Sequence, residues 1–216
     1  MRAGLTQAQA ALGLGVSQPY LSQLERGDRA VTEDLARRAA KLYRLPATDW
    51  PLPEVTTQRA TDPERLARQL AGLGYPGFAH LRGQRANPAA VLLEALRQPD
   101  LEVRLAEALP WVALAYPELD WDWLVPQAKL FDLQNRLGFV VATARTAAAH
   151  RSNASVLTAL TAVEQRLEHA RLAREDTLCR ESMPQAERRW LVNARPALAR
   201  HWNLLTGLTA EQLLHA

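Results

Sequence analysis

Alanine and leucine dominate the sequence and restrict the folds that are open to it. The 216 residues include 38 Ala and 37 Leu, but only 12 Val and no Ile. Ala and Leu lose little conformational entropy in a helix, whereas β-branched residues are the ones that favour strands. No alternating apolar pattern of useful length indicates a strand. The composition therefore predicts an all-α protein.

Several classes of protein are disfavoured by simple counts. The single Cys excludes an internal disulfide framework and a cysteine-based zinc cluster, and the five His follow no metal-binding spacing. No apolar run approaches the length that spans a bilayer, and no leader-like segment is evident. No serine lies in a nucleophile elbow. We therefore expect a soluble cytoplasmic protein that is not an enzyme and that needs no cofactor and no metal.

The excess positive charge lies in the first fifth of the chain. The net charge is +3, and residues 1–46 carry seven basic and four acidic side chains, whereas residues 47–216 carry 19 of each. A small basic segment attached to a neutral body suits an anionic polymer as the partner.

Prolines divide the chain into two parts. Four of them fall within residues 46–63, where they block helix continuation and favour extended chain. The sequence thus predicts a small head over residues 1–46, a Pro-rich linker over 47–61 and a larger helical bundle over 62–216. Six to eight helices are expected in this bundle. The longest should cover 119–149 with a break near Pro126, another should cover 155–178, and Pro110 should kink or break a third.

Residues 5–27 have the pattern of two short helices joined by a tight turn. Thr6 and Ser17 are expected N-caps, and a corner over residues 13–15 uses the freedom of glycine at positive φ. Helices joined in this way cross steeply, so Ala11 should face Leu21. The exposed face of the second helix is then expected to be Gln18, Pro19, Tyr20, Ser22 and Gln23.

A known family shares this register. The matching residues are Thr6-Gln7, Ala11, Gly15-Val16-Ser17, Leu21-Ser22 and Leu24-Glu25-Arg26-Gly27. The segment resembles the helix-turn-helix of the phage-repressor-like (Xre/Cro type) transcriptional regulators. The resemblance covers about residues 4–46, including a helix that starts at Thr32, and the C-terminal body shows no such likeness.

The resemblance implies that the second helix enters the major groove of DNA. Gln18 and Gln23 match positions that touch base edges, where a glutamine can bond an adenine in bidentate fashion. Gln7 matches a helix start that touches phosphate. The DNA-binding residues implied in this way are Gln7, Ser17, Gln18, Pro19, Tyr20, Ser22, Gln23, Arg26 and Arg29.

One departure from the family pattern leaves three alternatives open. Members usually carry a full helix before the position of Thr6, which closes the back of the small core, and here Met1 to Leu5 precede it. Ala10 is also smaller than the Leu that is common at its position. Either the start codon is assigned too late, or the C-terminal body covers the exposed face, or the head is degenerate and no longer binds DNA.

Two groups in the C-terminal body have an open role. Aromatic residues could line an effector pocket, dock a partner protein or simply fill the core; the candidates are Trp111, Trp121, Trp123 and Phe131. Polar residues at 129–136 indicate either a buried network or a recognition surface.

Together these patterns predict a sequence-specific DNA-binding transcriptional regulator that acts as a homodimeric repressor. In one hypothesis the body binds a cognate toxin or another protein, and the chain is the antitoxin of a toxin–antitoxin pair. In a second, the body binds a small effector. In a third, the chain is a helical interaction protein with a degenerate helix-turn-helix.

Overall fold

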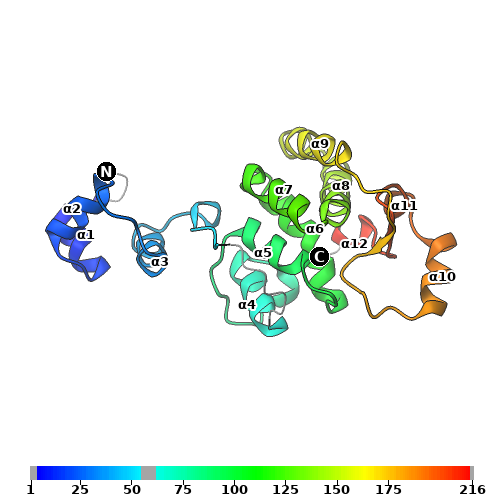
Figure 1. The fold of residues 1–216 in the computed structure, drawn as a ribbon, viewed down its shortest axis with the longest axis horizontal. Coiled ribbons are helices and arrows are strands. Elements are labelled where there is room, and N and C mark those ends of the chain that lie inside the picture. Colours follow the sequence, from blue (N-terminus) through cyan, green and yellow to red (C-terminus); the bar gives the residue numbers. More distant parts are fainter. Residues whose placement is uncertain (1–3, 55–61, 215–216) are drawn as a thin grey trace. The chain divides into compact units, whose positions relative to one another are not determined.

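The structure, a computed structural model, describes residues 4–54 and 62–214, and the chain divides into two compact units, Met1–Val55 (unit 1) and Thr56–Ala216 (unit 2). Both units are built from helices (Figure 1). The all-α class predicted from the sequence is confirmed. Residues 55–61, part of the expected linker, lie outside the described residues, while residues 47–49 form a short 3-10 helix, η1 (Ala47–Asp49).

Unit 1 contains three α-helices: α1 (Gln7–Leu14), α2 (Gln18–Glu25) and α3 (Glu33–Leu42). Each begins after a side-chain cap, because the oxygens of Thr6, Ser17 and Thr32 accept hydrogen bonds from backbone N–H groups of the first turn. The N-cap predictions for Thr6 and Ser17 are confirmed. Thr6 and Gln9 also form a reciprocal capping box.

The turn between α1 and α2 is tighter than the sequence predicts. Gly13 and Leu14 belong to α1, so the corner is made by Gly15 alone, which has φ of 67°. This left-handed conformation ends the helix, and its N–H bonds the carbonyls of Ala11 and Leu12. Gly13 lies within α1 at the point where α3 approaches. A Cβ at this position would lie 2.9 Å from Leu42 Cδ1, so glycine allows the two helices to come close.

The core of unit 1 is small and draws on all three helices. Its buried members are Ala10, Ala11, Leu14, Leu21 and Leu35, and Leu24 and Leu42 pack against them. Ala11 and Leu21 thus lie in one core, as the steep crossing of α1 and α2 requires.

Unit 2 has nine α-helices among its described residues, one more than the upper limit of the prediction. They are α4 (Pro63–Leu73), α5 (Pro88–Leu96), α6 (Val103–Ala115), α7 (Trp121–Leu130), α8 (Gln134–His150), α9 (Ala154–Glu168), α10 (Gln185–Ala194), α11 (Ala197–His201) and α12 (Glu211–Leu214). A short 3-10 helix, η2 (Pro76–Phe78), follows α4.

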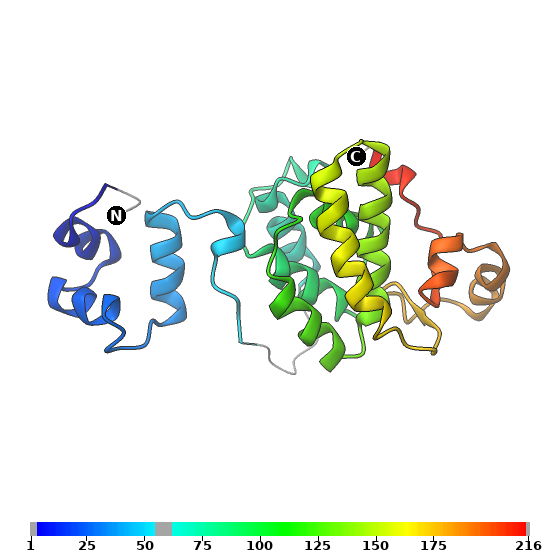
Figure 2. The same cartoon turned by 90° about the horizontal axis from the view of Figure 1, so that it is seen from above.

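Helix α8 forms the centre of unit 2. Residues 134–144 are all buried, and α8 packs along α9 and against α6 (Figure 2). Gly138 lies against the fully buried ring of Trp202, where a Cβ would stand 2.2 Å from ring carbon Cζ3. A residue without a side chain is therefore required at this contact.

Several helix boundaries differ from the prediction. Helix α6 runs through Pro110 without a break, and α7 runs through Pro126 without a break. The expected long helix is interrupted instead at Asp132, which has φ of 58°. Aspartate tolerates this left-handed conformation better than most residues, but an isolated aspartate gives no clear signal in a sequence. Helix α9 also ends at Glu168, ten residues before the predicted end at 178.

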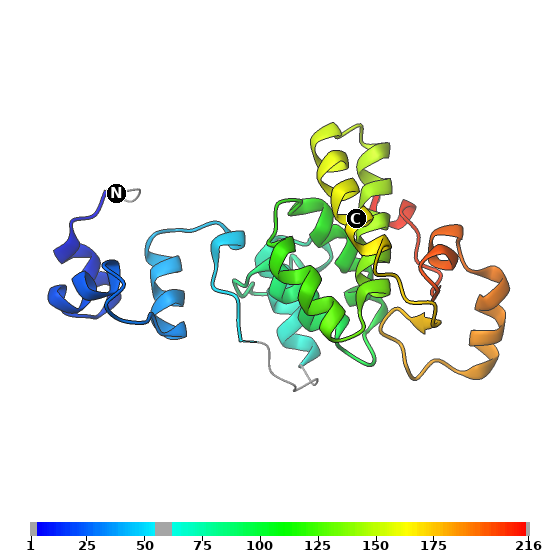
Figure 3. The ribbon, with the colours of Figure 1, turned by 45° about the horizontal axis from the view of Figure 1, so that its top comes forward.

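The segment after α9 contains short strands that the sequence did not predict. Residues 170–184 form an irregular stretch of turns and bends that joins α9 to α10 (Figure 3). Within it, β1 (Asp176–Thr177) pairs in parallel with β2 (Leu204–Leu205). Strands of two residues are too short to produce an alternating pattern.

A buried polar network holds this stretch in place. Arg136, which is 4% exposed, donates to both carboxylate oxygens of Asp176 at 2.7 and 3.0 Å and to the carbonyl oxygens of Leu96 and Gln98. Asn135 exchanges two hydrogen bonds with the backbone of Leu172. Of the two alternatives for the polar group at 129–136, these residues form the buried network, whereas Lys129 and Asp132 are exposed.

Candidate nucleic-acid interface

Helix α2 buries one side and presents the other. Leu21 is its buried residue, and Leu24 packs beside the same core. The first turn begins with the Ser17 cap and accommodates Pro19, whose missing N–H has no partner to lose at this position. Gln18 and Pro19 are exposed, and Ser22 and Gln23 are half-buried. Tyr20, expected on the exposed face, is half-buried and packs against the core. The face of α2 away from the core is therefore open to a ligand.

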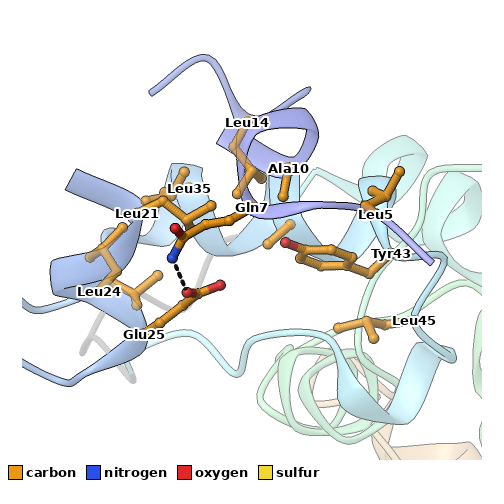
Figure 4. A pocket seen from close by; sticks show the side chains of 12 residues that line it. Leu5, Gln7, Ala10, Leu14, Leu21, Leu24, Glu25, Leu35, Tyr43 and Leu45 are labelled. Carbon is orange, nitrogen blue, oxygen red and sulfur yellow. Dashed lines mark hydrogen bonds between the residues drawn. The ribbon is translucent and has the colours of Figure 1, made fainter. Parts of the chain in front are cut away.

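Three side chains from α1 and α2 form a chain of hydrogen bonds. Gln18 Nε2 donates to Gln7 Oε1 at 3.2 Å, and Gln7 Nε2 donates to Glu25 Oε2 at 2.7 Å. Figure 4 shows the Gln7 amide nitrogen directed at the Glu25 carboxylate. The fold thus brings two of the expected DNA-binding glutamines together and links both to an acidic residue.

Two arginines extend the same surface in different ways. The guanidinium of Arg29 lies 5.3 Å from the centre of the Tyr20 ring and has no acidic partner among the described residues. Arg26, by contrast, is paired with Asp28 at 2.9 Å and also reaches Ser22 Oγ. Stacking restrains the Arg29 side chain without neutralising its charge, which leaves the charge available to a phosphate.

Most other arginines of unit 1 are neutralised on their own helix. Arg37 pairs with Glu33, and Arg38 pairs with Asp34 and donates to Leu14 O. Arg29 therefore differs from these arginines, because its charge lies beside α2 and has no acidic partner among the described residues.

One residue of this site was missed by the sequence reading. Glu25 stands 18 positions from Gln7, so no local pattern relates the two. The signal that could have found it is the helical spacing on α2, because Gln18 and Glu25 lie seven residues apart and share one face.

Residues 1–50 match the family model described as Helix-turn-helix. The N-terminal segment is a helix-turn-helix domain. The resemblance of this segment to the Xre/Cro type is thereby confirmed, and the family is one of DNA-binding transcription regulators rather than enzymes. Comparisons with curated proteins and with solved structures gave no match.

An apolar groove opens on the helix-turn-helix domain beside the hydrogen-bond chain. Its volume is about 710 Å³, and side chains from all three helices line it (Figure 4). Leu5, Leu24, Tyr43 and Leu45 contribute apolar surface, and Gln7 and Glu25 stand at its polar side. The groove shows that residues 5–45 leave part of the domain core open.

The aromatic candidates of unit 2 have separate environments. Trp111 makes edge contacts with Tyr75 and Tyr116. Phe131 lies under the guanidinium of Arg97 at 4.1 Å. Trp121 is buried and donates to Pro117 O, and Trp123 is half-buried. A cavity of about 320 Å³ in unit 2 is lined by other residues, and binding of an effector at the aromatic residues stays a prediction.

Cys179 lies at the buried network of Arg136. Burial raises the pKa of its thiol to about 12, although the nearby Arg136 acts in the opposite direction. Its Sγ bonds the carbonyl oxygens of Ala95 and Leu96. A thiol of this kind is protonated near neutral pH and is a poor nucleophile.

Within residues 4–54 and 62–214, no group of three or more His, Cys, Asp or Glu is placed to hold a metal ion. Over the same ranges, no helix combines the length and the apolar character needed to cross a membrane.

Proposed function

We propose that the protein is a sequence-specific DNA-binding transcriptional regulator that reads duplex DNA with α2. The observation that carries this proposal is the division of α2 into a face buried through Leu21 and a face that presents Gln18 and Pro19. A helix of eight residues exposed in this way fits the major groove.

Gln18 is the residue that we expect to read a base. One N–H of its amide is engaged by Gln7, which leaves a second N–H and the oxygen Oε1 for a ligand. Adenine offers an acceptor and a donor side by side in the major groove, and an amide matches this pair. Ser17, Pro19, Ser22 and Gln23 lie on the same helix or at its cap and would complete the contact surface.

Replacing Gln18 tests this contact. The operator is first selected from a random duplex pool with the full chain. We expect Gln18→Ala to weaken specific binding by about 1–3 kcal/mol and to relax the preference at one base pair, as loss of a bidentate contact does. Fluorescence anisotropy with single-base operator variants measures both effects. Gln165→Ala, at an exposed position of α9, is the matched control. An unchanged preference at every position would refute the assigned contact.

Arg29 and Arg26 are expected to contact phosphates. Because Arg29 carries no acidic partner among the described residues, Arg29→Ala should weaken binding to all sequences alike and lower the slope of log K against log salt by about 1. A titration series at several salt concentrations measures this slope. Arg82→Ala removes the same charge from an exposed position of unit 2 and should leave the slope unchanged. Equal slopes for Arg29→Ala and the wild type would contradict the assignment.

The small size of a single helix-turn-helix favours binding of DNA by two symmetry-related copies. One helix-turn-helix covers only a few base pairs, so useful affinity needs two copies on paired half-sites. We therefore propose a homodimer on a palindromic operator. Light scattering of the free chain and of the operator complex gives the number of copies, and one copy per operator would contradict the proposal.

Repression is the regulatory outcome that we propose, because a dimer that occupies a promoter blocks transcription by occupancy alone. A reporter fused to the selected operator should be less active when the chain is expressed. Pairing with a toxin stays a prediction from the resemblance, and its test is whether the product of a neighbouring gene copurifies with the tagged chain.

A further inference from the structure

We propose that Glu25 fixes the orientation of the reading amide of Gln18 without touching DNA. The inference rests on the proposed function and adds a positioning residue to it. Its basis is the chain of two hydrogen bonds from Gln18 to Gln7 and from Gln7 to Glu25.

A carboxylate at one end of this series of hydrogen bonds determines which end of each amide donates and which end accepts. An ionised carboxylate only accepts hydrogen bonds, whereas each end of an amide is either a donor or an acceptor. Glu25 therefore selects the NH₂ end of Gln7, at 2.7 Å, and leaves Oε1 of Gln7 to face Gln18. This oxygen in turn selects the NH₂ end of Gln18.

The reverse arrangement is disfavoured at both links. If the Gln7 amide turned over, its oxygen would face the Glu25 carboxylate and its NH₂ group would face that of Gln18. The first contact sets two acceptors against each other and the second sets two donors against each other. Hydrogen bonds to charged groups are also the stronger kind, so the link at Glu25 determines the direction.

The orientation of the Gln18 amide matters because the edge of a base presents a donor and an acceptor in a fixed order. Adenine presents N7 as an acceptor and N6 as a donor in a fixed order. With its orientation set, Gln18 offers a free N–H and a free oxygen in one order only. An amide that samples both orientations can bind the adenine edge in only one of them. The apparent affinity for the base is therefore reduced to the fraction of time that the amide spends in that orientation.

The variant Glu25→Gln tests the proposal because a glutamine can donate as well as accept. We expect discrimination at the base pair that Gln18 reads to fall about twofold to tenfold, while discrimination at other positions is unchanged. In the Gln18→Ala background the same substitution should change nothing at that base pair. Gln7→Met, which removes the middle link, should reproduce the loss.

The matched control is Glu33→Gln. It removes one negative charge from the same domain, at the first turn of α3, away from the chain of amides. Both variants should bind non-specific DNA slightly more tightly than the wild type, but only Glu25→Gln should lose discrimination. An equal loss in both variants, or a loss spread over all base pairs, would overturn the inference.

A measurement on the free protein separates this inference from the proposed function. Glu25→Gln should shift the side-chain NH₂ resonances of Gln18 in a ¹H–¹⁵N spectrum, and Glu33→Gln should not. Unmoved Gln18 resonances would overturn the proposed effect of Glu25 on the Gln18 amide, even if the wild type selects an operator. If the resonances move but no operator is selected, the proposed function is wrong, while the effect of Glu25 on the Gln18 amide is supported.

Discussion

Arg136→Met is expected to destabilise unit 2 by about 3–5 kcal/mol, the usual cost of removing one partner from a buried ion pair. The substitution keeps most of the volume but leaves the Asp176 carboxylate, whose side chain is 21% exposed, without its bidentate partner. The carbonyl oxygens of Leu96 and Gln98 lose a donor as well. Urea unfolding followed by tryptophan fluorescence measures the effect, because five of the six Trp lie in residues 56–216.

Two comparisons show whether the buried pair is responsible. Arg174→Met removes one member of an exposed pair with Asp132, 3.7 Å apart, and should cost at most about 1 kcal/mol. The double variant Arg136→Met/Asp176→Leu should recover part of the loss, because it no longer leaves an unpaired buried charge. Equal midpoints for Arg136→Met and Arg174→Met would contradict the role given to this network.

Leu21→Ala is expected to unfold the helix-turn-helix domain and to abolish DNA binding. Leu21 is 5% exposed in a core of five buried residues, and its truncation should cost about 2–5 kcal/mol. A domain of this size has a total stability of about the same magnitude. A ¹H–¹⁵N spectrum should lose the dispersed signals of residues 4–45 and keep those of unit 2.

The control for this variant is Leu12→Ala on the neighbouring helix. Leu12 is 83% exposed, so its truncation should change stability by less than about 0.5 kcal/mol and leave DNA binding intact. A folded Leu21→Ala domain that binds the operator like the wild type would show that the core has been placed wrongly.

The local features of the head could be predicted because their causes are local. Thr6 and Ser17 cap helices through bonds to residues three positions away, and Gly15 takes a conformation that glycine adopts at little cost. The positions of the prolines did not indicate where the helices are interrupted. Pro110 and Pro126 both lie inside helices, and the break at Asp132 depends on packing that a single sequence does not reveal.

Contacts between distant residues could not be predicted in the same way. Arg136 meets Asp176 across 40 positions, and Gln7 meets Glu25 across 18. From the sequence, the polar residues at 129–136 could form either a buried network or a recognition surface. Only the burial of residues 134–136 against the 170–184 stretch decides between the two. The individual DNA contacts came from the resemblance to a family, and they stay predictions.

Competition binding with the selected operator tests the central claim most directly. A labelled operator bound by the wild-type chain at physiological salt is challenged with unlabelled operator and with a scrambled duplex of the same composition. If α2 reads base edges, the scrambled duplex should compete at least about 10³-fold less well, the lower end for specific regulators. Equal competition by both duplexes would contradict a sequence-reading role for this domain.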